Sequence, residues 1–250
     1  MDRPVVLLTG AAQGIGRVAA ESFSAEGWQV VAADYQQAEG YSENVTFQLC
    51  NVTEPEQVST LIEGVRKKFG RLDSLVNNAA IQVSKPFLET TMEEWDAVMA
   101  VNLRAVFLMT QAAHPMLKET GGSIVNVSSV HALATSTEIA AYATSKGGLL
   151  ALTRALAIEF AADNMRVNAV LPGAVDTEML REGLSRNHVS GESVEERLEA
   201  LGARTVMGRV GEPWEIARAI LFLADGDQSS FMTGSALVVD GGATVRLSTE

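Results

Sequence analysis

The sequence has few of the features that mark membrane-anchored or disulfide-stabilised proteins. It contains one cysteine, Cys50, which excludes an intrachain disulfide and favours a reducing compartment. No run reaches the roughly 18 uncharged apolar residues that a membrane-spanning helix needs. The apolar run near the N-terminus is too short for a signal peptide. We therefore expect a cytoplasmic protein that does not use a membrane as a partner.

Basic residues are scarce as well. The chain of 250 residues has 19 Lys and Arg against 31 Asp and Glu, which gives a formal net charge of -12. A negative excess of this kind opposes binding to nucleic acids and to anionic membranes. His, Cys and carboxylate residues also lack the spacing of metal ligands, so we predict no metal site.

Short apolar runs rich in β-branched residues recur along the chain. Most are continuous rather than alternating, which is typical of parallel strands that are covered on both faces. Stretches with helical spacing lie between them, so the pattern predicts one doubly wound α/β sheet with helices on both faces, in a single domain spanning residues 1–250. The predicted strands are Val5 to Leu8, Val30 to Ala33, Val45 to Leu49, Ser74 to Asn77, Ile124 to Val127, Arg166 to Val170 and Ala236 to Val239.

Two helix starts and one irregular segment can be read from local patterns. "TEPE" from Thr53 and "TMEE" from Thr91 both predict a capping box at the start of a helix. A polar stretch with several glycines, at about residues 178–209, interrupts the alternation before the helix that begins at Pro213. It is either a surface excursion or a lid over a site, and its place in the fold favours the lid.

A glycine-rich turn links the first predicted strand to the first helix. In "TGAAQGIG", Gly10, Gly14 and Gly16 permit a tight turn, so that a pyrophosphate can rest on the N-terminus of the helix. Asp34 ends the second strand, where a carboxylate can accept both hydroxyls of an adenosine ribose. Together the two features predict a site for a dinucleotide.

A tyrosine and a lysine share one face of another predicted helix, which runs from Ala141 to Phe160. Tyr142 and Lys146 stand at i and i+4. A lysine ammonium near a phenol stabilises the phenolate, so we expect the pKa of Tyr142 to fall toward working pH. That would make Tyr142 a proton donor and acceptor. The alternative is a half-buried aromatic beside a solvated surface charge.

Taken in order along the chain, these motifs resemble those of the short-chain dehydrogenase/reductase family. The resemblance covers essentially the whole sequence. It implies a Rossmann-type sheet of seven parallel strands, a nicotinamide dinucleotide and a small-molecule substrate that is a secondary alcohol or its ketone, with a polyol or sugar favoured. The further motifs that carry it are "NNAA" at Asn77 to Ala80, Asn102, Ser129 thirteen residues before Tyr142, "PGAVDT" at Pro172 to Thr177, and "DGG" at Asp240 to Gly242.

The resemblance implies a catalytic tetrad of Asn102, Ser129, Tyr142 and Lys146. Tyr142 would exchange the substrate's hydroxyl proton, and Ser129 would hydrogen-bond the same oxygen. Lys146 would lower the pKa of the phenol and donate to the nicotinamide ribose. Asn102 would hold a water that carries the proton away.

The same resemblance assigns a set of cofactor contacts. Two of the family's positions differ in this sequence: Asn51 replaces a usual aspartate, which should weaken the adenine contact little, and Ala80 replaces a usual glycine, which is expected to narrow the nearby cofactor space. The implied cofactor residues are Gly10, Gln13, Gly14, Ile15, Gly16, Asp34, Asn51, Val52, Asn78, Ala79, Tyr142, Lys146, Pro172, Gly173, Val175 and Thr177.

Charge around the second strand indicates NAD rather than NADP. Asp34 would repel a 2′-phosphate, and residues 35–37 follow it without a cation. Gln13 stands before Gly14, where phosphate-binding relatives often carry a basic residue. We therefore predict NAD as the cofactor.

Other functions and partners remain open at this stage. A 3-oxoacyl carrier reductase is one alternative, and a non-catalytic NAD-sensing regulator is another, although the intact Ser129, Tyr142 and Lys146 oppose the regulator. His131 and Glu138 either bind a polyhydroxylated substrate or are exposed loop residues. Two helices with few charges, from Val101 and after Lys146, would expose apolar surface, so we expect a homotetramer.

Overall fold

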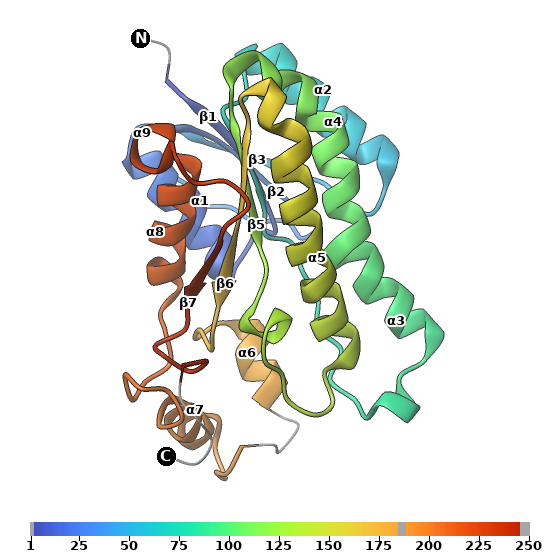
Figure 1. Ribbon diagram of the computed structural model, residues 1–250, viewed down its shortest axis with the longest axis vertical. Coiled ribbons are helices and arrows are strands. Elements are labelled where there is room, and N and C mark those ends of the chain that lie inside the picture. Colours follow the sequence, from blue (N-terminus) through green and yellow to red (C-terminus); the bar gives the residue numbers. More distant parts are fainter. Residues whose placement is uncertain (1–2, 185–188, 246–250) are drawn as a thin grey trace.

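A computed structural model describes residues 3–184 and 189–245, and its centre is a parallel β-sheet (Figure 1). The sheet has seven strands in the order β3-β2-β1-β4-β5-β6-β7, which confirms the predicted doubly wound fold. Each predicted apolar run lies within one strand. The strands are β1 Val5–Thr9, β2 Gln29–Asp34, β3 Val45–Leu49, β4 Ser74–Asn77, β5 Ser123–Val127, β6 Arg166–Pro172 and β7 Ala236–Val239.

Helices cover both faces of the sheet. Figure 1 shows α1 and α8 on one face and α2, α4 and α5 on the other. No helix in the described ranges is both long enough and apolar enough to span a membrane. The α-helices are α1 Gly14–Ala25, α2 Pro55–Phe69, α3 Met92–Met99, α4 Ala105–Thr120, α5 Ala140–Glu159, α6 Glu178–Gly183, α7 Val194–Gly202, α8 Pro213–Ala224 and α9 Gly226–Ser229.

The apolar strands are continuous because successive side chains enter two different cores. In β1, Val5 and Leu7 pack into the core beneath α2 and α4, whereas Val6 and Leu8 pack into the core beneath α1 and α8. All four side chains are buried. Side chains alternate across a strand, so a strand with helices on both faces needs apolar residues at every position.

A helix begins at each of the two predicted helix starts, but only one of the two predicted capping boxes is correct. Thr91 caps α3 and forms a full capping box with Glu94. The capping box predicted at Thr53 is wrong, because α2 is capped at Glu54 without a side-chain hydrogen bond. The Thr53 hydroxyl instead donates to Oδ1 of Asn51 at 2.8 Å. A neighbouring Asn side chain has thus bonded the threonine that would have capped the helix.

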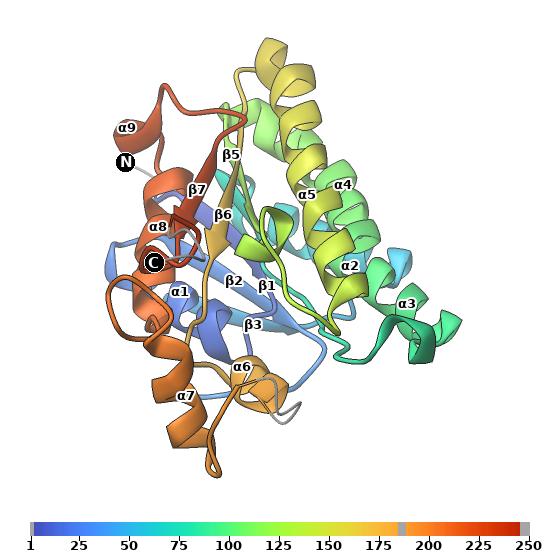
Figure 2. The same cartoon turned by 60° about the horizontal axis from the view of Figure 1, so that its bottom comes forward.

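The segment predicted as a lid contains two helices, α6 and α7, which lie beyond the carboxyl ends of the strands (Figure 2). A small apolar cluster of its own, formed around Leu184, Val189 and Leu198, supports these helices. Residues 185–188 of the predicted lid lie outside the described residues. The polar stretch is therefore a helical unit at the edge of the sheet where parallel strands end.

Candidate active site

Predicted site residues from distant parts of the sequence meet at the carboxyl ends of the strands. The glycine loop follows β1, Asp34 ends β2, Asn78 follows β4 and Ser129 follows β5. The order of the strands reverses between β1 and β4, next to the glycine loop. Open α/β sheets bind their ligands in the crevice at such a reversal.

The glycine loop is a tightly packed turn. Gly10 has a φ of +67°, and a Cβ there would lie 2.6 Å from Cα of Ala79. The side chain of Asn78 donates to the carbonyl oxygens of Thr9 and Gly10 at 3.0 and 2.9 Å. At Gly16 a Cβ would overlap the carbonyl of Gly10. The loop is thus held by the "NNAA" segment. The contact of a pyrophosphate with the start of α1 remains a prediction.

The carboxylate of Asp34 is buried and already fixed in direction. Its Oδ2 accepts from the backbone N–H of Ala12 and its Oδ1 from that of Gln36, both at 2.9 Å. A carboxylate has about four acceptor positions, so each oxygen keeps one for a further donor. Asp34 can therefore accept ribose hydroxyls without giving up either backbone contact.

Asn51, which follows β3, already uses the oxygen that was expected to bind adenine. Oδ1 of Asn51, the acceptor expected to meet adenine, already accepts from the backbone N–H of Thr53 at 3.1 Å and from its hydroxyl at 2.8 Å. Val52 is buried beside it. The contact between Asn51 and adenine remains a prediction, since one oxygen would have to serve three donors.

Tyr142 and Lys146 lie in the first two turns of α5, and both are buried. The Tyr142 hydroxyl is hydrogen-bonded to Ser129. The Lys146 amine donates to the carbonyl oxygen of Val127 at 2.8 Å, and its nitrogen lies 5.5 Å from the centre of the Tyr142 ring. The structure therefore brings together three of the four predicted catalytic residues.

The predicted fall in the pKa of Tyr142 is wrong for the protein by itself. Burial raises the pKa of Tyr142 to about 12, although the hydrogen bond with Ser129 acts in the opposite direction. Burial also lowers the pKa of Lys146 to about 7. Both shifts have one cause, since a site removed from water disfavours the phenolate and the ammonium alike. At neutral pH Tyr142 is a protonated phenol, the form that gives a proton.

The side chain of Asn102 connects two segments of the candidate site by hydrogen bonds. It lies in a π-helical turn, Ala100–Arg104, between α3 and α4. Its amide accepts from the N–H of Ile81 and donates to the carbonyl of Ile81, both at 2.9 Å. It also donates to the hydroxyl of Ser145 at 3.0 Å. Both amide hydrogens are thus used to tie the loop after β4 to the helix that carries Tyr142 and Lys146.

The two predicted substrate residues have different surroundings. His131 is half-buried, with its ring centre 6.0 Å from that of Tyr142, and its Nδ1 lies 3.0 Å from the hydroxyl of Thr135. Glu138 has a φ of +62°, which is uncommon for a residue with a side chain. Such strained conformations cluster at functional sites. His131 therefore lies beside Tyr142. Glu138 is near Tyr142 in the sequence, and its contact with a substrate remains a prediction.

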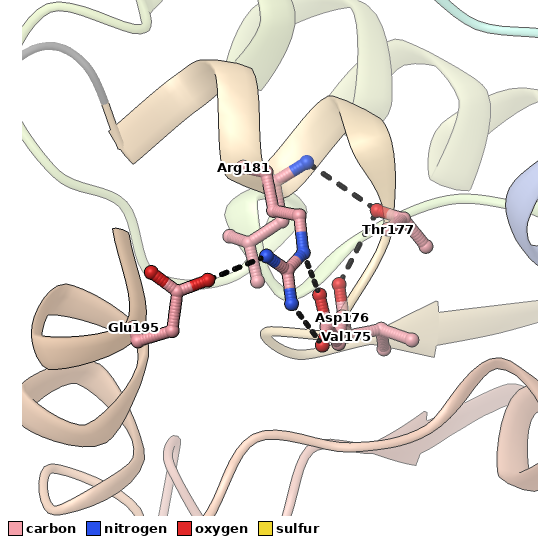
Figure 3. Close-up of polar contacts among 6 residues, drawn as sticks. Val175, Asp176, Thr177, Arg181 and Glu195 are labelled. Atoms are coloured by element: carbon pink, nitrogen blue, oxygen red, sulfur yellow. Dashed lines mark hydrogen bonds and ion pairs between the residues drawn. The ribbon is translucent and has the colours of Figure 1, made fainter. Parts of the chain in front are cut away.

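The end of β6 leads into an arginine network at the start of the predicted lid. Arg181 of α6 contacts both carboxylate oxygens of Asp176, at 2.7 and 2.9 Å, and reaches Glu195 of α7 at 3.3 Å (Figure 3). Thr177 caps α6, and its hydroxyl donates to the carbonyl of Val175. The segment from Pro172 to Thr177, which is predicted to contact nicotinamide, is therefore anchored at its end to α6 and, through Arg181, to α7.

An open cavity of about 380 Å³ lies between the glycine loop and α6. Its lining includes Gly14 on one side and Thr177 on the other, and a Cβ at Gly14 would lie 3.4 Å from the methyl group of Thr177. Two arginines line the same cavity, Arg17 and Arg181. The glycine loop and the start of the predicted lid thus border the same cavity.

Some residues that shape the site were missed in the sequence. Ser145, which bridges Asn102 to the backbone of Tyr142, precedes Lys146 directly, and this adjacency was the only signal. Arg17 and Tyr41 brace the region around Asp34, and no local pattern pairs them. Among the residues that the structure describes, no three His, Cys, Asp or Glu side chains gather as a metal site would require.

Comparisons with known proteins agree with this geometry. A family described as Enoyl-(Acyl carrier protein) reductase matches residues 10–244. The chain is 39% identical to the 3-oxoacyl-[acyl-carrier-protein] reductase FabG of Thermotoga maritima, over 98% of this chain and 99% of the relative. It is 37% identical to a cyclopentanol dehydrogenase of Comamonas sp., over 96% of each chain.

Solved structures agree over nearly the full length. The aldohexose dehydrogenase of Thermoplasma acidophilum has a TM-score of 0.92 at 35% identity, covering 98% of this chain and 96% of that one. A 3-ketoacyl-(acyl-carrier-protein) reductase of Brucella melitensis complexed with NADH has a TM-score of 0.87 at 32% identity, covering 96% and 98%. ElxO with NADP bound has a TM-score of 0.87 at 30% identity, covering 98% and 100%.

The chain belongs to the short-chain dehydrogenase/reductase family. It is an oxidoreductase of the NAD(P)-dependent alcohol dehydrogenase and ketoreductase class.

Proposed function

We propose that this protein is an NAD-dependent dehydrogenase that interconverts a secondary alcohol and its ketone. The observation that carries the choice of NAD is the buried carboxylate of Asp34 at the end of β2, held by the N–H groups of Ala12 and Gln36. Its remaining acceptor positions suit two ribose hydroxyls. The glycine loop, the segment from Pro172 to Thr177, and the other cofactor residues named above would hold the dinucleotide.

A 2′-phosphate beside Asp34 would place two like charges a few ångströms apart, at a cost of roughly 1 to 4 kcal/mol in a partly solvated site. Arg17 is the nearby cation that the sequence argument overlooked. Its guanidinium donates to the carbonyls of Glu39 and Gly40 at 2.7 and 3.0 Å and stacks on Tyr41. Both hydrogen bonds come from one terminal nitrogen of the guanidinium and hold it against the loop at Glu39 and Gly40. The choice of NAD over NADP therefore rests on the charge of Asp34.

The chemistry follows from the groups around Tyr142. The bound nicotinamide supplies or accepts the hydride. Tyr142 gives its proton to the carbonyl oxygen during reduction. In the oxidation direction the phenol must first lose its proton, and the phenolate then takes the proton of the alcohol. Ser129, hydrogen-bonded to the phenol, holds the same substrate oxygen. Lys146 binds the nicotinamide ribose, and Asn102 keeps the helix of Tyr142 and Lys146 in place through Ser145.

A small polyol or sugar is the substrate that we favour. His131 and Glu138 supply polar groups on the loop before α5, and such groups suit a polyhydroxylated substrate. Relatives are named for cyclopentanol, butanediol and aldohexose. The alternative, a 3-oxoacyl carrier reductase, is favoured by the Thermotoga maritima relative. The net charge of -12 disfavours an acidic carrier protein as the partner.

We further propose a cytoplasmic homotetramer in which residues 1–250 form one cofactor-binding and catalytic domain. The support for self-association is apolar surface on the outer helices, including Phe107 of α4, which is 52% exposed. The region from 178 to 209 would be the substrate lid, since α6 and α7 stand at the carboxyl ends of the strands.

A substrate screen tests the function. The purified protein is offered polyols, sugars, hydroxy acids and steroid alcohols with NAD, and 3-oxoacyl thioesters with NADH, while absorbance at the nicotinamide band is followed. We expect turnover with a polyol or sugar. Turnover only with 3-oxoacyl thioesters would favour the carrier reductase, and NADH binding without any turnover would favour the NAD-sensing regulator.

Cofactor choice is tested with the best substrate from that screen. We expect kcat/KM to favour NAD over NADP by at least roughly tenfold, since about 1.4 kcal/mol corresponds to one decade. Replacing Asp34 by Ser together with Tyr35 by Arg removes the repulsion and supplies a phosphate partner, so NADP activity should rise. Equal use of both cofactors by the natural protein, or no gain by a folded double variant, would contradict the proposal.

A further inference from the structure

The peptide bond between Ala11 and Ala12 is hydrogen-bonded at both ends. Its N–H, on Ala12, donates to Oδ2 of Asp34 at 2.9 Å. Its carbonyl oxygen, on Ala11, accepts from the Tyr41 hydroxyl at 2.7 Å. One planar peptide therefore connects the phenol of Tyr41 to the carboxylate of Asp34. Hydrogen bonds in such a chain polarise one another, so the phenol strengthens the contact made by the Ala12 N–H.

Tyr41 is itself fixed in place. Its ring stacks on Phe47 of β3, with ring centres 5.7 Å apart and planes 15° from parallel. The guanidinium of Arg17 also lies over the Tyr41 ring, 3.8 Å from the ring centre. The phenol is thus held between a strand and a helix, and its hydroxyl points at the glycine loop.

The loop that carries Tyr41 is fastened along one face of α1. Arg17 donates to the carbonyls of Glu39 and Gly40, the carboxylate of Glu21 accepts from the N–H of Ser42, and Ser24 accepts from the hydroxyl of Ser42. Positions 17, 21 and 24 lie one turn apart, so they share a helical face. This arrangement ties the loop after Asp34 to the helix that follows the glycine loop.

We propose that Tyr41 is a positioning residue for adenosine ribose binding, acting through the Ala11–Ala12 peptide on the carboxylate of Asp34. The phenol sets the plane of this peptide. The peptide N–H then sets the direction of Oδ2, and with it the acceptor positions that face the ribose hydroxyls. The inference rests on the proposed NAD function, because the ligand concerned is the adenosine half of that cofactor.

Tyr41→Phe is the direct test, because it removes the hydroxyl and keeps the ring against Phe47 and Arg17. Binding is measured by fluorescence titration with NADH and by calorimetry with ADP-ribose, so no substrate is needed. We expect the dissociation constants of both ligands to rise about three- to tenfold, the size of one hydrogen bond. Binding of reduced nicotinamide mononucleotide, which lacks the adenosine half, should stay unchanged.

Ser22→Ala is the matched control. It also removes a hydroxyl that donates to a backbone carbonyl, that of Val18 at 2.8 Å, and it lies on α1, the helix to which the loop of Tyr41 is bonded. We expect NADH affinity within twofold of the natural protein. Circular dichroism melting and the stoichiometry of ADP-ribose binding show that each variant is folded. An equal loss of affinity in Ser22→Ala would overturn the proposal, since the effect would then not be specific to Tyr41.

A double-mutant cycle with Asp34→Ala separates positioning from a general structural effect. If Tyr41 acts through Asp34, Tyr41→Phe should change NADH affinity by less than twofold once Asp34 is absent. The same loss in both backgrounds, or no loss in either, would overturn the proposal. A natural protein that binds no NADH would instead contradict the proposed function, so the two failures are distinguishable.

Discussion

At the scale of single residues, burial decides the protonation of Tyr142 and Lys146, the proposed catalytic pair. Tyr142 and Lys146 both lie out of water, and each is driven toward its neutral form. The phenol is therefore ready to donate a proton, while the lysine titrates near neutral pH. A lysine beside a phenol lowers the pKa of the phenol only when the lysine keeps its proton, and burial opposes that here.

Tyr142→Phe should abolish turnover and leave cofactor affinity nearly unchanged. The substitution deletes the proton that moves during the reaction, and it keeps the buried ring. We expect kcat to fall at least about a thousandfold, within the range for loss of a general acid or base. NADH titration of the same preparation should give an affinity within about threefold of the natural protein. Activity within tenfold would contradict the role of Tyr142.

Lys146→Met should change how stability depends on pH. The ordinary pKa of lysine is 10.5, and burial lowers that of Lys146 to about 7. Between these values the unfolded chain binds the proton and the folded protein does not, so the free energy of unfolding increases with pH. From pH 7 to 8.5 we expect this group to add about 1 to 2 kcal/mol.

Urea unfolding of the natural protein and of Lys146→Met at both pH values measures this difference. Ionisable groups that both proteins share cancel in the comparison. The variant should show the smaller rise. Equal slopes would mean that Lys146 keeps its proton in the folded protein.

At the scale of elements, an arginine links the two helices of the proposed lid to the end of β6. Arg181 binds Asp176 with two hydrogen bonds and reaches Glu195 with one (Figure 3). The carboxylates hold the pKa of the Arg181 guanidinium above its usual range. The side chains are partly exposed to solvent, so the network contributes modestly to stability.

Arg181→Met should loosen α7 without unfolding the sheet. Exposed ion pairs contribute little to stability, so we expect amide hydrogens of residues 194–202 to exchange only about two- to fivefold faster. Glu195→Gln serves as the graded control, because it disturbs only the contact of 3.3 Å and should have a smaller effect. Unchanged exchange in Arg181→Met would show that the apolar cluster around Leu198 holds α7 alone.

At the scale of the whole molecule, α4 and α5 run side by side across one face (Figure 1). Their inner sides fill the core, but Phe107 of α4 and Ile158 of α5 are 52% and 80% exposed. Covering apolar side chains of this size with a partner lowers the free energy of the assembly. A second copy of the chain would remove this surface from water.

A charge at this surface should therefore lower the oligomeric state. We expect Phe107→Lys and Leu152→Lys to form smaller particles than the natural protein, since a buried unpaired charge is costly at an interface. Light scattering on size-separated samples gives the particle mass, and circular dichroism checks the fold. Particles of the natural size from both variants would place these residues outside the interface.

Features that depend on local sequence were predictable. The continuous apolar runs matched the strands, because a strand that is buried on both faces needs apolar residues at consecutive positions. The glycine loop and the Tyr142 and Lys146 pair were also found, since a tight turn and one turn of helix span only a few positions. The capping box at Thr53 failed because Asn51, just outside the pattern, bonded to its hydroxyl.

Only the tertiary structure decided the features that depend on residues distant in sequence. The pKa shifts of Tyr142 and Lys146 come from burial by the whole fold, and spacing along a helix carries no information about solvent access. Tyr41 reaches Ala11 across 30 positions, and Asn102 reaches Ser145 across 43. The physical reason is the same in each case: the folding of the sheet brings these groups within hydrogen-bonding distance, and that approach is not encoded in any short stretch.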